Sequence, residues 1–372
     1  WDSRLLTLVA AELSDEIAIP VFQTGTCLSV PEILEFFDER RRAREPVVLV
    51  TVYETQGSTY SKAGAQMLLD GAGRFHGMLS GGCLEGDLAV RAAEVVASGS
   101  PQVVTYDLAQ DDELWGLGVG CDGLMRVLLQ PLTADSNYEP FTTIAEIYDG
   151  TDPRRFALVV DPGGDEIEAG ASVLEFGDGL RAFGVDEEIA ETLIGCGDDD
   201  GIANCSAGAG SIKVLRTTLK PAPRILVLGA GMDAEPVVRM AAELGWRCTV
   251  VDHRDTYIER GSFDRAEAVI CAPAENLAAA VRLSQFDAAI VMSHHLVSDR
   301  AYLRQLAETE IGYVGLLGPV NRRDRLLAEL GAGGESLDGR IHGPAGLDIG
   351  GRGAAAIALS IVAQVQNFLG RG

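Results

Sequence analysis

The chain of 372 residues is long enough for about two or three domains, and its 47% hydrophobic and 23% charged residues are typical of a globular protein rather than a disordered one. Thirty Lys and Arg residues against 55 Asp and Glu residues give a formal net charge of −25. A field of that sign repels nucleic-acid phosphates and anionic membrane surfaces. We therefore expect no nucleic acid and no membrane among its partners.

The seven cysteines are scattered along the chain without a Cys-x-x-Cys pair, which predicts reduced thiols rather than a disulfide framework or a structural zinc site. The apolar stretch 354–370 is too short and too often interrupted by polar residues to cross a bilayer, so we expect a buried helix there. The sequence opens without the basic and apolar segments of a secretory signal. These features predict a cytoplasmic protein.

Four regions follow one another along the chain. Residues 1–28 carry no pattern that we assign, and a helix start at Ser29 opens region 29–132, whose short β-rich runs predict an α+β domain. Residues 133–222 contain modest strand patterns and end in a proline-containing linker, so we expect a β-rich middle segment without catalytic residues. From 223 to 372 strand and helix patterns alternate, which predicts a Rossmann-like, doubly wound parallel sheet. The fold class is thus α/β.

The expected elements follow this division. In the first domain, strands are expected at 47–53, 66–69, 103–108 and 124–130, and a helix at 84–96. The middle segment should contain strands at 156–160, 172–175 and 212–217. The last domain should alternate strands at 224–228, 248–251, 268–271, 288–292 and 313–317 with helices at 234–244, 299–308 and 322–330.

The first strand–helix junction of the last domain carries a dinucleotide-type glycine loop. Gly229 permits a tight turn, Gly231 lets a pyrophosphate approach the backbone, and the small Ala234 allows the helix to pack closely. Asp252 ends the next strand about 20 residues later, where a ribose-binding carboxylate belongs. The pattern predicts NAD(P) binding, but it is also compatible with a Rossmann fold whose site serves another ligand or none. The Asp233 carboxylate would compete with a bound phosphate for the helix N-terminus.

Two cysteines lie in glycine-rich loops, where a core position is not expected. Cys83 follows Gly81 and Gly82 and precedes the helix expected at 84–96, and a helix N-terminus stabilises a thiolate. Cys121 ends a second glycine-rich loop. We interpret both as candidate soft ligands or nucleophiles, and the other five as small buried hydrophobic residues.

Two further loops contain groups that could bind a ligand. The loop at 54–65 combines hydroxyl groups, glycines and a lysine, so Ser58 and Lys62 are candidates for an anion-binding cradle, and an ordinary solvated turn is the alternative. His294 and His295 follow a strand at the edge where doubly wound sheets bind ligands.

Six glycine-rich blocks stand in an order that resembles the XdhC/CoxI family of accessory proteins for molybdenum hydroxylases. The blocks are GSTYSKAGA at 57–65, SGGCLEG at 80–86, GLGVGC at 116–121, GAG at 229–231, YVGLLG at 313–318 and HGPAGLDIG at 342–350. The resemblance implies a chaperone that binds the molybdenum cofactor, supports its sulfuration and delivers it to an apo-hydroxylase such as xanthine dehydrogenase.

A molybdenum centre held by a dithiolene is soft and favours thiolate ligands, so Cys83 is our candidate metal ligand and Cys121 the second choice. The family resemblance implies a molybdenum hydroxylase and a cysteine desulfurase as partners, and we expect a homodimer. We assign no catalytic residue. Two alternatives remain open: an NAD(P)-dependent oxidoreductase that uses the glycine loop, and a scaffold that binds the hydroxylase and the sulfurase without any small ligand.

Overall fold

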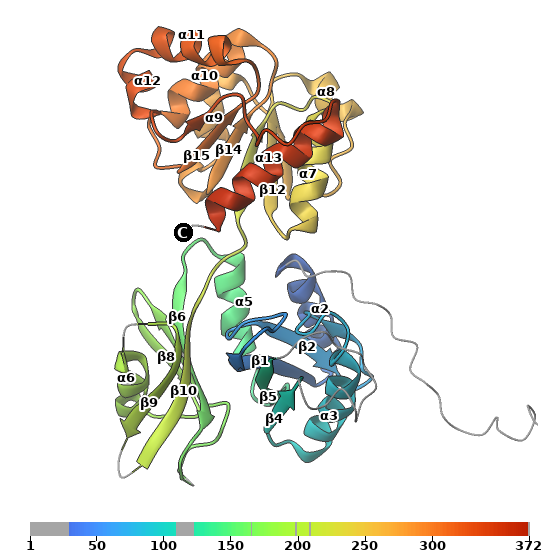
Figure 1. Ribbon diagram of the computed structural model, residues 1–372, viewed down its shortest axis with the longest axis vertical. Coiled ribbons are helices and arrows are strands. Elements are labelled where there is room, and N and C mark those ends of the chain that lie inside the picture. Colours follow the sequence, from blue (N-terminus) through green and yellow to red (C-terminus); the bar gives the residue numbers. More distant parts are fainter. Residues whose placement is uncertain (1–29, 109–122, 165, 198, 208–209, 371–372) are drawn as a thin grey trace, which may run out of the picture. The chain divides into compact units, whose positions relative to one another are not determined.

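The computed structural model describes residues 30–108 and 123–370, apart from residues 165, 198, 208 and 209 (Figure 1). Its strands form three separate sheets, two antiparallel and one parallel. Internal contacts divide the chain into two units, one containing Arg40–Asn137 and the other containing the first part of helix α2 (Val30–Ala43) together with the chain from Tyr138 onward. The domain boundaries expected at 28, 132 and 222 stay predictions.

The first sheet has the strand order β3-β2-β1-β5-β4, and every neighbouring pair is antiparallel. Its strands are β1 (Val47–Gln56), β2 (Gln66–Asp70), β3 (Phe75–His76), β4 (Gln102–Asp107) and β5 (Leu124–Leu132). Helix α3 (Glu85–Ser98) packs on one face, where Leu88, Ala92 and Val95 meet alternate residues of the central strand. This alternation arises because successive side chains of a strand point to opposite faces.

The second sheet has the order β8-β7-β6-β10-β9 and is also antiparallel. It comprises β6 (Arg154–Asp161), β7 (Ser172–Phe176), β8 (Gly179–Phe183), β9 (Gly201–Ala207) and β10 (Gly210–Leu219), with helix α6 (Glu187–Gly195) packed against it and α5 (Phe141–Asp149) preceding it. Cys196 and Cys205 form a disulfide with a Cα–Cα distance of 5.8 Å. The prediction of reduced thiols is therefore wrong for this pair. Cys196 directly follows α6 and lies beside Cys205 in β9, although nine positions separate the two in the sequence.

The third sheet is parallel and has the order β13-β12-β11-β14-β15-β16, in which the chain moves outward from the centre first in one direction and then in the other. This order is that of a Rossmann fold, whose ligand edge lies where the direction reverses, between β11 and β14. Helices α7 and α13 cover one face, and α9, α10 and α11 the other (Figure 1). The predicted α/β class with a C-terminal doubly wound sheet is confirmed.

The elements of this domain alternate as the sequence predicts. They are β11 (Arg224–Leu228), α7 (Ala234–Glu243), β12 (Arg247–Asp252), α8 (Asp255–Arg260), β13 (Ala268–Cys271), η1 (Ala274–Asn276), α9 (Leu277–Ala280), η2 (Leu283–Gln285), β14 (Ala288–Val291), α10 (Leu296–Leu306), β15 (Tyr313–Leu316), α11 (Val320–Leu330), α12 (Ala332–Ser336), β16 (Ile341–His342) and α13 (Ala354–Leu369). The expected buried helix near the C-terminus is α13, which contributes Ile361 and Val365 to the core. Within the part of the chain that the structure describes, no helix has both the length and the apolar composition of a membrane span.

Candidate functional site

The loop between β3 and α3 is organised around the carboxylate of Glu85, the first residue of α3. Only 2% of Glu85 is exposed, and its Oε1 accepts hydrogen bonds from the backbone N–H groups of Leu79 and Ser80 at 3.0 and 2.9 Å. Its Oε2 accepts from the N–H of Gly82 at 3.0 Å and from the Ser80 hydroxyl. A buried carboxylate needs such a set of donors. Glu85 therefore fixes the path of the glycine turn.

Cys83 is half-buried and lies in this turn, two residues before Glu85. Gly81 and Gly82 adopt φ values of 76° and 107°, a region in which side chains are strained, so the turn requires glycines. The backbone N–H groups of Leu79, Ser80 and Gly82, which precede the thiol in the chain, donate to Glu85 rather than to the sulfur. Among the described residues, the thiol itself has no hydrogen-bond partner.

The loop that follows β1 contacts the thiol loop directly. The Ser61 hydroxyl donates to the carbonyl of Met78 at 3.2 Å. The ring of Tyr60 lies beside Gly81, where a Cβ atom would be 3.5 Å from two ring carbons, and 58% of Tyr60 is exposed. The ammonium group of Lys62 lies 3.5 Å from the Thr59 hydroxyl and is otherwise exposed. An aromatic ring and a cation are thus placed next to the loop of Cys83.

A third segment reaches the same region at Gly123. A Cβ atom on Gly123 would lie 2.4 Å from the carbonyl oxygen of Ser58 and 2.7 Å from the Thr59 side chain. Cys121, two residues earlier, lies outside the described residues, so the structure does not place its thiol. The predicted residues Ser58, Lys62, Gly81, Gly82 and Cys83 are therefore in loops at one end of the first sheet.

The donor set of this region suits the molybdenum cofactor. A thiol can bind a soft metal, an exposed aromatic ring can stack on a heterocycle, and an ammonium group can pair with a phosphate. Among the described residues no group of three or more His, Cys, Asp or Glu side chains could hold a metal ion. In this part of the chain, Cys83 would therefore act as a single protein ligand.

The glycine loop of the Rossmann-like domain has the expected tight turn. Gly229 has a φ of 127°, and a Cβ atom there would lie 2.6 Å from the carbonyl oxygen of Met292. Ala234 is fully buried where α7 packs against the sheet. The space beside Gly231 is already filled, because a Cβ atom at this position would be 2.6 Å from Oδ1 of Asp233.

Asp252 lies at the end of β12, as predicted, but it is 0% exposed. Its Oδ2 accepts from the N–H of Ala230 and from Nη2 of Arg254, both at 2.7 Å, and its Oδ1 accepts from Nε of Arg254 at 2.9 Å. Burial by itself raises the pKa of the Asp252 carboxyl, but the hydrogen bonds from Arg254 and Ala230 outweigh this effect and hold the pKa below its ordinary value. The carboxylate is an internal counter-ion.

The two histidines after β14 have different roles. His295 is the N-cap residue of α10, and its Nδ1 lies 2.9 Å from the Ser298 hydroxyl, which is a structural contact. His294 is 58% exposed on its side chain, has a φ of 58°, and places Nε2 2.6 Å from Oδ2 of Asp233. Asp233 and His294 line a pocket of about 770 Å³ with Glu235, Tyr257 and other residues of this edge.

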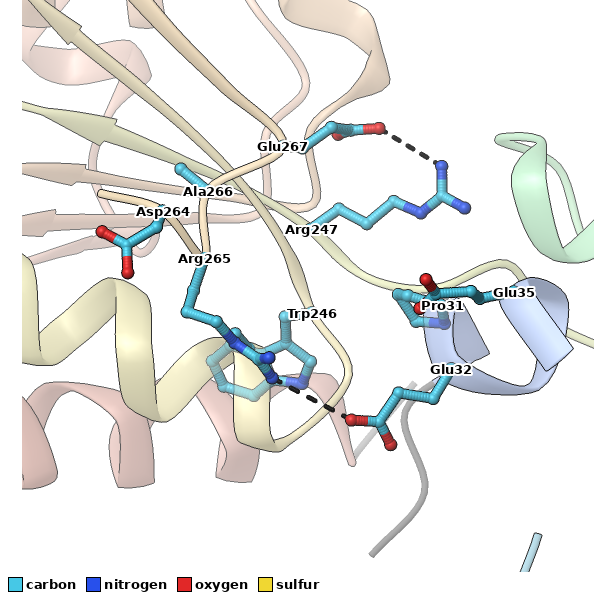
Figure 2. A pocket seen from close by; sticks show the side chains of 10 residues that line it. Pro31, Glu32, Glu35, Trp246, Arg247, Asp264, Arg265, Ala266 and Glu267 are labelled. Atoms are coloured by element: carbon cyan, nitrogen blue, oxygen red, sulfur yellow. Dashed lines mark hydrogen bonds and ion pairs between the residues drawn. The ribbon is translucent and has the colours of Figure 1, made fainter. Parts of the chain in front are cut away.

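A smaller pocket of about 390 Å³ contains none of the residues that the sequence predicts for a site (Figure 2). Figure 2 shows Arg265 directed toward Glu32 of α2, 4.0 Å away, and Arg247 paired with Glu267 at 3.2 Å. These charges are satisfied by ion pairs within the pocket wall.

Sequence reasoning missed two residues of these sites. Glu85 stands in the block SGGCLEG, and its position in the first turn of a helix, just after glycines and a serine, was the available signal. Arg254 follows Asp252 by two residues, and a spacing alone does not show that its guanidinium turns back onto the carboxylate.

The fold and site define a protein with a thiol-bearing loop in an α+β domain and a separate Rossmann-like domain. The model of the XdhC and CoxI family matches residues 40–107, and that of the XdhC Rossmann domain matches residues 225–365. The chain belongs to the XdhC and CoxI family.

Relatives resemble the chain over most of its length. It is 29% identical over 335 residues to a probable xanthine dehydrogenase subunit of Bacillus subtilis, covering 87% of this chain and 93% of the relative. It is 24% identical over 336 residues to the molybdenum cofactor insertion chaperone PaoD of Escherichia coli, covering 90% and 86%. A crystal structure described as a xanthine dehydrogenase from Bacillus halodurans superposes with a TM-score of 0.78 at 29% identity, covering 93% of this chain and 97% of that one.

Proposed function

We propose that this protein is a chaperone that binds the molybdenum cofactor at the loop of Cys83 and delivers it to a molybdenum hydroxylase. The observation that carries the proposal is the Cys83 thiol, which has no hydrogen-bond partner among the described residues and lies in a turn fixed by Glu85. The names of the two curated relatives, one a cofactor insertion chaperone and one belonging to a dehydrogenase, agree with this assignment.

Each part of the cofactor has a matching group in the first domain. The thiolate of Cys83 supplies a soft anionic ligand for molybdenum. The exposed ring of Tyr60, held beside Gly81, supplies a surface on which a pterin can stack, and Lys62 supplies a charge for a phosphate.

The exposure of this region suits transfer rather than permanent storage. Tyr60, Lys62, Gly81 and Gly82 are all exposed, so cargo held there remains accessible to a second protein. One thiolate with few enclosing groups binds less tightly than a closed coordination shell. A carrier needs this property, because its cargo must leave.

The proposal includes three features that the family resemblance suggests. The protein supports sulfuration of the bound cofactor, for which a cysteine desulfurase is the partner. The client is an apo-hydroxylase of the xanthine dehydrogenase type. The chaperone acts as a cytoplasmic homodimer.

The rival function, an NAD(P)-dependent oxidoreductase, rests on the Rossmann-like domain and its glycine loop. The positions of Gly229 and Ala234 suit that function. The buried Asp252 does not, because its oxygen atoms are bound by Arg254 and Ala230 rather than offered to a ribose. The chaperone is therefore the better-supported function.

The proposal is tested by transfer between purified proteins. The full chain is expressed beside a cofactor source, purified anaerobically, and assayed for molybdenum by mass spectrometry and for pterin by fluorescence after oxidation. Loaded protein is then mixed with an apo-hydroxylase. We expect both components in the chaperone and their appearance in the hydroxylase. A preparation that contains neither molybdenum nor pterin would contradict the proposal.

A further inference from the structure

We infer that the Rossmann-like domain of this protein excludes nicotinamide dinucleotides, because its own side chains occupy both places in which such a ligand is held. The inference concerns a different domain from the thiol loop and goes beyond the proposed function. It rests on two internal pairs, the Asp252–Arg254 ion pair and the hydrogen bond between Asp233 and His294.

The first occupied place is the one for the ribose. In dinucleotide-binding folds the carboxylate at the end of the second strand accepts hydrogen bonds from the ribose hydroxyls. Here the carboxylate of Asp252 has no exposed surface and receives four hydrogen bonds, one from the N–H of Ala230 and three from Arg254. The guanidinium of Arg254 also lies 3.7 Å from the centre of the Tyr257 ring and is thereby fixed. A ribose would have to displace a bidentate ion pair.

The second occupied place is the one for the pyrophosphate. The second glycine of the loop lets phosphate approach the backbone only if the space that its missing side chain leaves is empty. Oδ1 of Asp233 fills this space at Gly231, since it lies 2.6 Å from the position of a Cβ atom. The carboxylate is 16% exposed and lies at the N-terminus of α7, so it repels a phosphate where the helix would otherwise attract one.

His294 fixes Asp233 in this position. Its Nε2 lies 2.6 Å from Oδ2 of Asp233. Asp233 lies in the loop between β11 and α7, and His294 lies in the loop between β14 and α10, so the pair joins the two neighbouring strands of the switch point. Within the described part of α7, the Asp233 side chain accepts no hydrogen bond from the helix amides. The carboxylate is therefore held by the imidazole rather than used as a helix cap.

The charges around the remaining pocket agree with this exclusion. The pocket is lined by the carboxylates of Asp233 and Glu235, by one guanidinium, that of Arg260, and by the imidazole of His294, which is hydrogen-bonded to Asp233. Dinucleotide phosphates require the opposite balance. The domain thus has the backbone turn of a dinucleotide-binding loop, but the acidic side chains of the pocket repel the pyrophosphate of a dinucleotide.

The test compares two variants that remove the same charge from the same pocket. Asp233→Asn removes the carboxylate over Gly231, and Glu235→Gln removes a carboxylate that accepts a hydrogen bond from the Ser262 N–H at 3.2 Å. NADH and NADPH are titrated into the full chain and both variants by fluorescence and calorimetry, and thermal unfolding confirms that each variant folds.

We expect the wild type and Glu235→Gln to bind both dinucleotides with Kd values of about 1 mM or weaker, and Asp233→Asn to bind at least roughly tenfold more tightly. Saturation of the wild type at micromolar NADH or NADPH overturns the inference. So does equal affinity of the two variants, because the excluding group would then not be Asp233. Molybdenum loading plays no part in this readout, so its outcome is independent of the proposed chaperone function.

Discussion

The backbone N–H of Gly82 donates to Oε2 of Glu85 over 3.0 Å, so a buried carboxylate holds the residue that immediately precedes Cys83. The same carboxylate binds the N–H groups of Leu79 and Ser80. The loop that carries the thiol is therefore positioned by the Glu85 side chain, which accepts its hydrogen bonds from the neighbouring backbone. Positioning of this kind keeps a metal-binding thiol in one orientation before the cofactor binds.

Glu85→Gln should weaken both the fold of the loop and the retention of molybdenum. The amide NH2 of glutamine cannot accept the hydrogen bonds that one carboxylate oxygen accepts from Gly82 and Ser80, and buried donors left without an acceptor cost about 1–3 kcal/mol. Urea unfolding and molybdenum content measure the two effects. Glu94→Gln, at an exposed position of the same helix, is the matched control and should change neither. Wild-type stability and loading in Glu85→Gln would contradict this role.

The ring of Tyr60 should matter for the pterin, and its hydroxyl should not. Stacking of a heterocycle on an aromatic side chain is worth about 1–3 kcal/mol, so Tyr60→Ala should lower pterin retention roughly tenfold. Tyr60→Phe keeps the ring beside Gly81 and should retain pterin at the wild-type level. The amount of pterin per chain, measured by fluorescence after oxidation, shows whether the ring or the hydroxyl is required. Equal loss in both variants would show that the hydroxyl rather than the ring is required.

Cys83, Cys248 and Cys271, the free cysteines among the described residues, should differ in reactivity. Burial, with a contribution from the nearby Glu267 carboxylate, raises the pKa of the Cys248 thiol to about 12, whereas Cys271 is exposed and Cys83 is half-buried. Iodoacetamide at pH 8 should therefore alkylate Cys83 and Cys271 and spare Cys248. Peptide mass spectrometry identifies the alkylated cysteines. Urea-unfolded protein, in which all three thiols should react, is the control. Rapid labelling of Cys248 in the folded protein would count against its burial.

The stability of the protein should fall as the pH decreases below about 6.5, in part because of His342. Burial lowers the pKa of this imidazole, which stacks on Tyr313 with ring centres 4.5 Å apart. The unfolded chain takes up the proton near pH 6.5, before the folded chain does. The free energy of unfolding therefore decreases as the pH falls from about 6.5 to the lower pKa of the folded state, and it stays at the reduced value below that pKa. His342→Phe keeps a stacked ring without this titration. Urea unfolding at pH 8 and pH 5.5 should show a smaller pH-dependent loss for the variant, and an identical loss would contradict the assignment.

The Rossmann-like domain could be predicted from sequence because its signals are local. Apolar strands alternate with amphipathic helices, and Gly229 and Ala234 stand at the junction that the fold requires. The role of Asp252 could not be predicted in the same way. Its spacing places the carboxylate at the strand end, but only the three-dimensional path of Arg254 shows that the carboxylate is already paired.

The first domain shows a similar limit. The glycines before Cys83 indicate a turn. The proximity of Tyr60 and Gly81, by contrast, depends on how two separate loops meet, one between β1 and β2 and the other between β3 and α3. The Cys196–Cys205 disulfide was missed because scattered cysteines in a large chain favour free thiols, and nothing in the intervening sequence shows that α6 ends beside β9.

The molybdenum content of three anaerobically purified proteins tests the central claim most directly: the wild type, Cys83→Ser and Cys271→Ser. Serine is close to cysteine in size but supplies no soft anionic ligand at neutral pH, so Cys83→Ser should fold with near wild-type stability and lose most of its molybdenum. Cys271→Ser removes an exposed free thiol of the other domain and should keep the wild-type content. Wild-type molybdenum in Cys83→Ser would show that this thiol does not hold the cofactor.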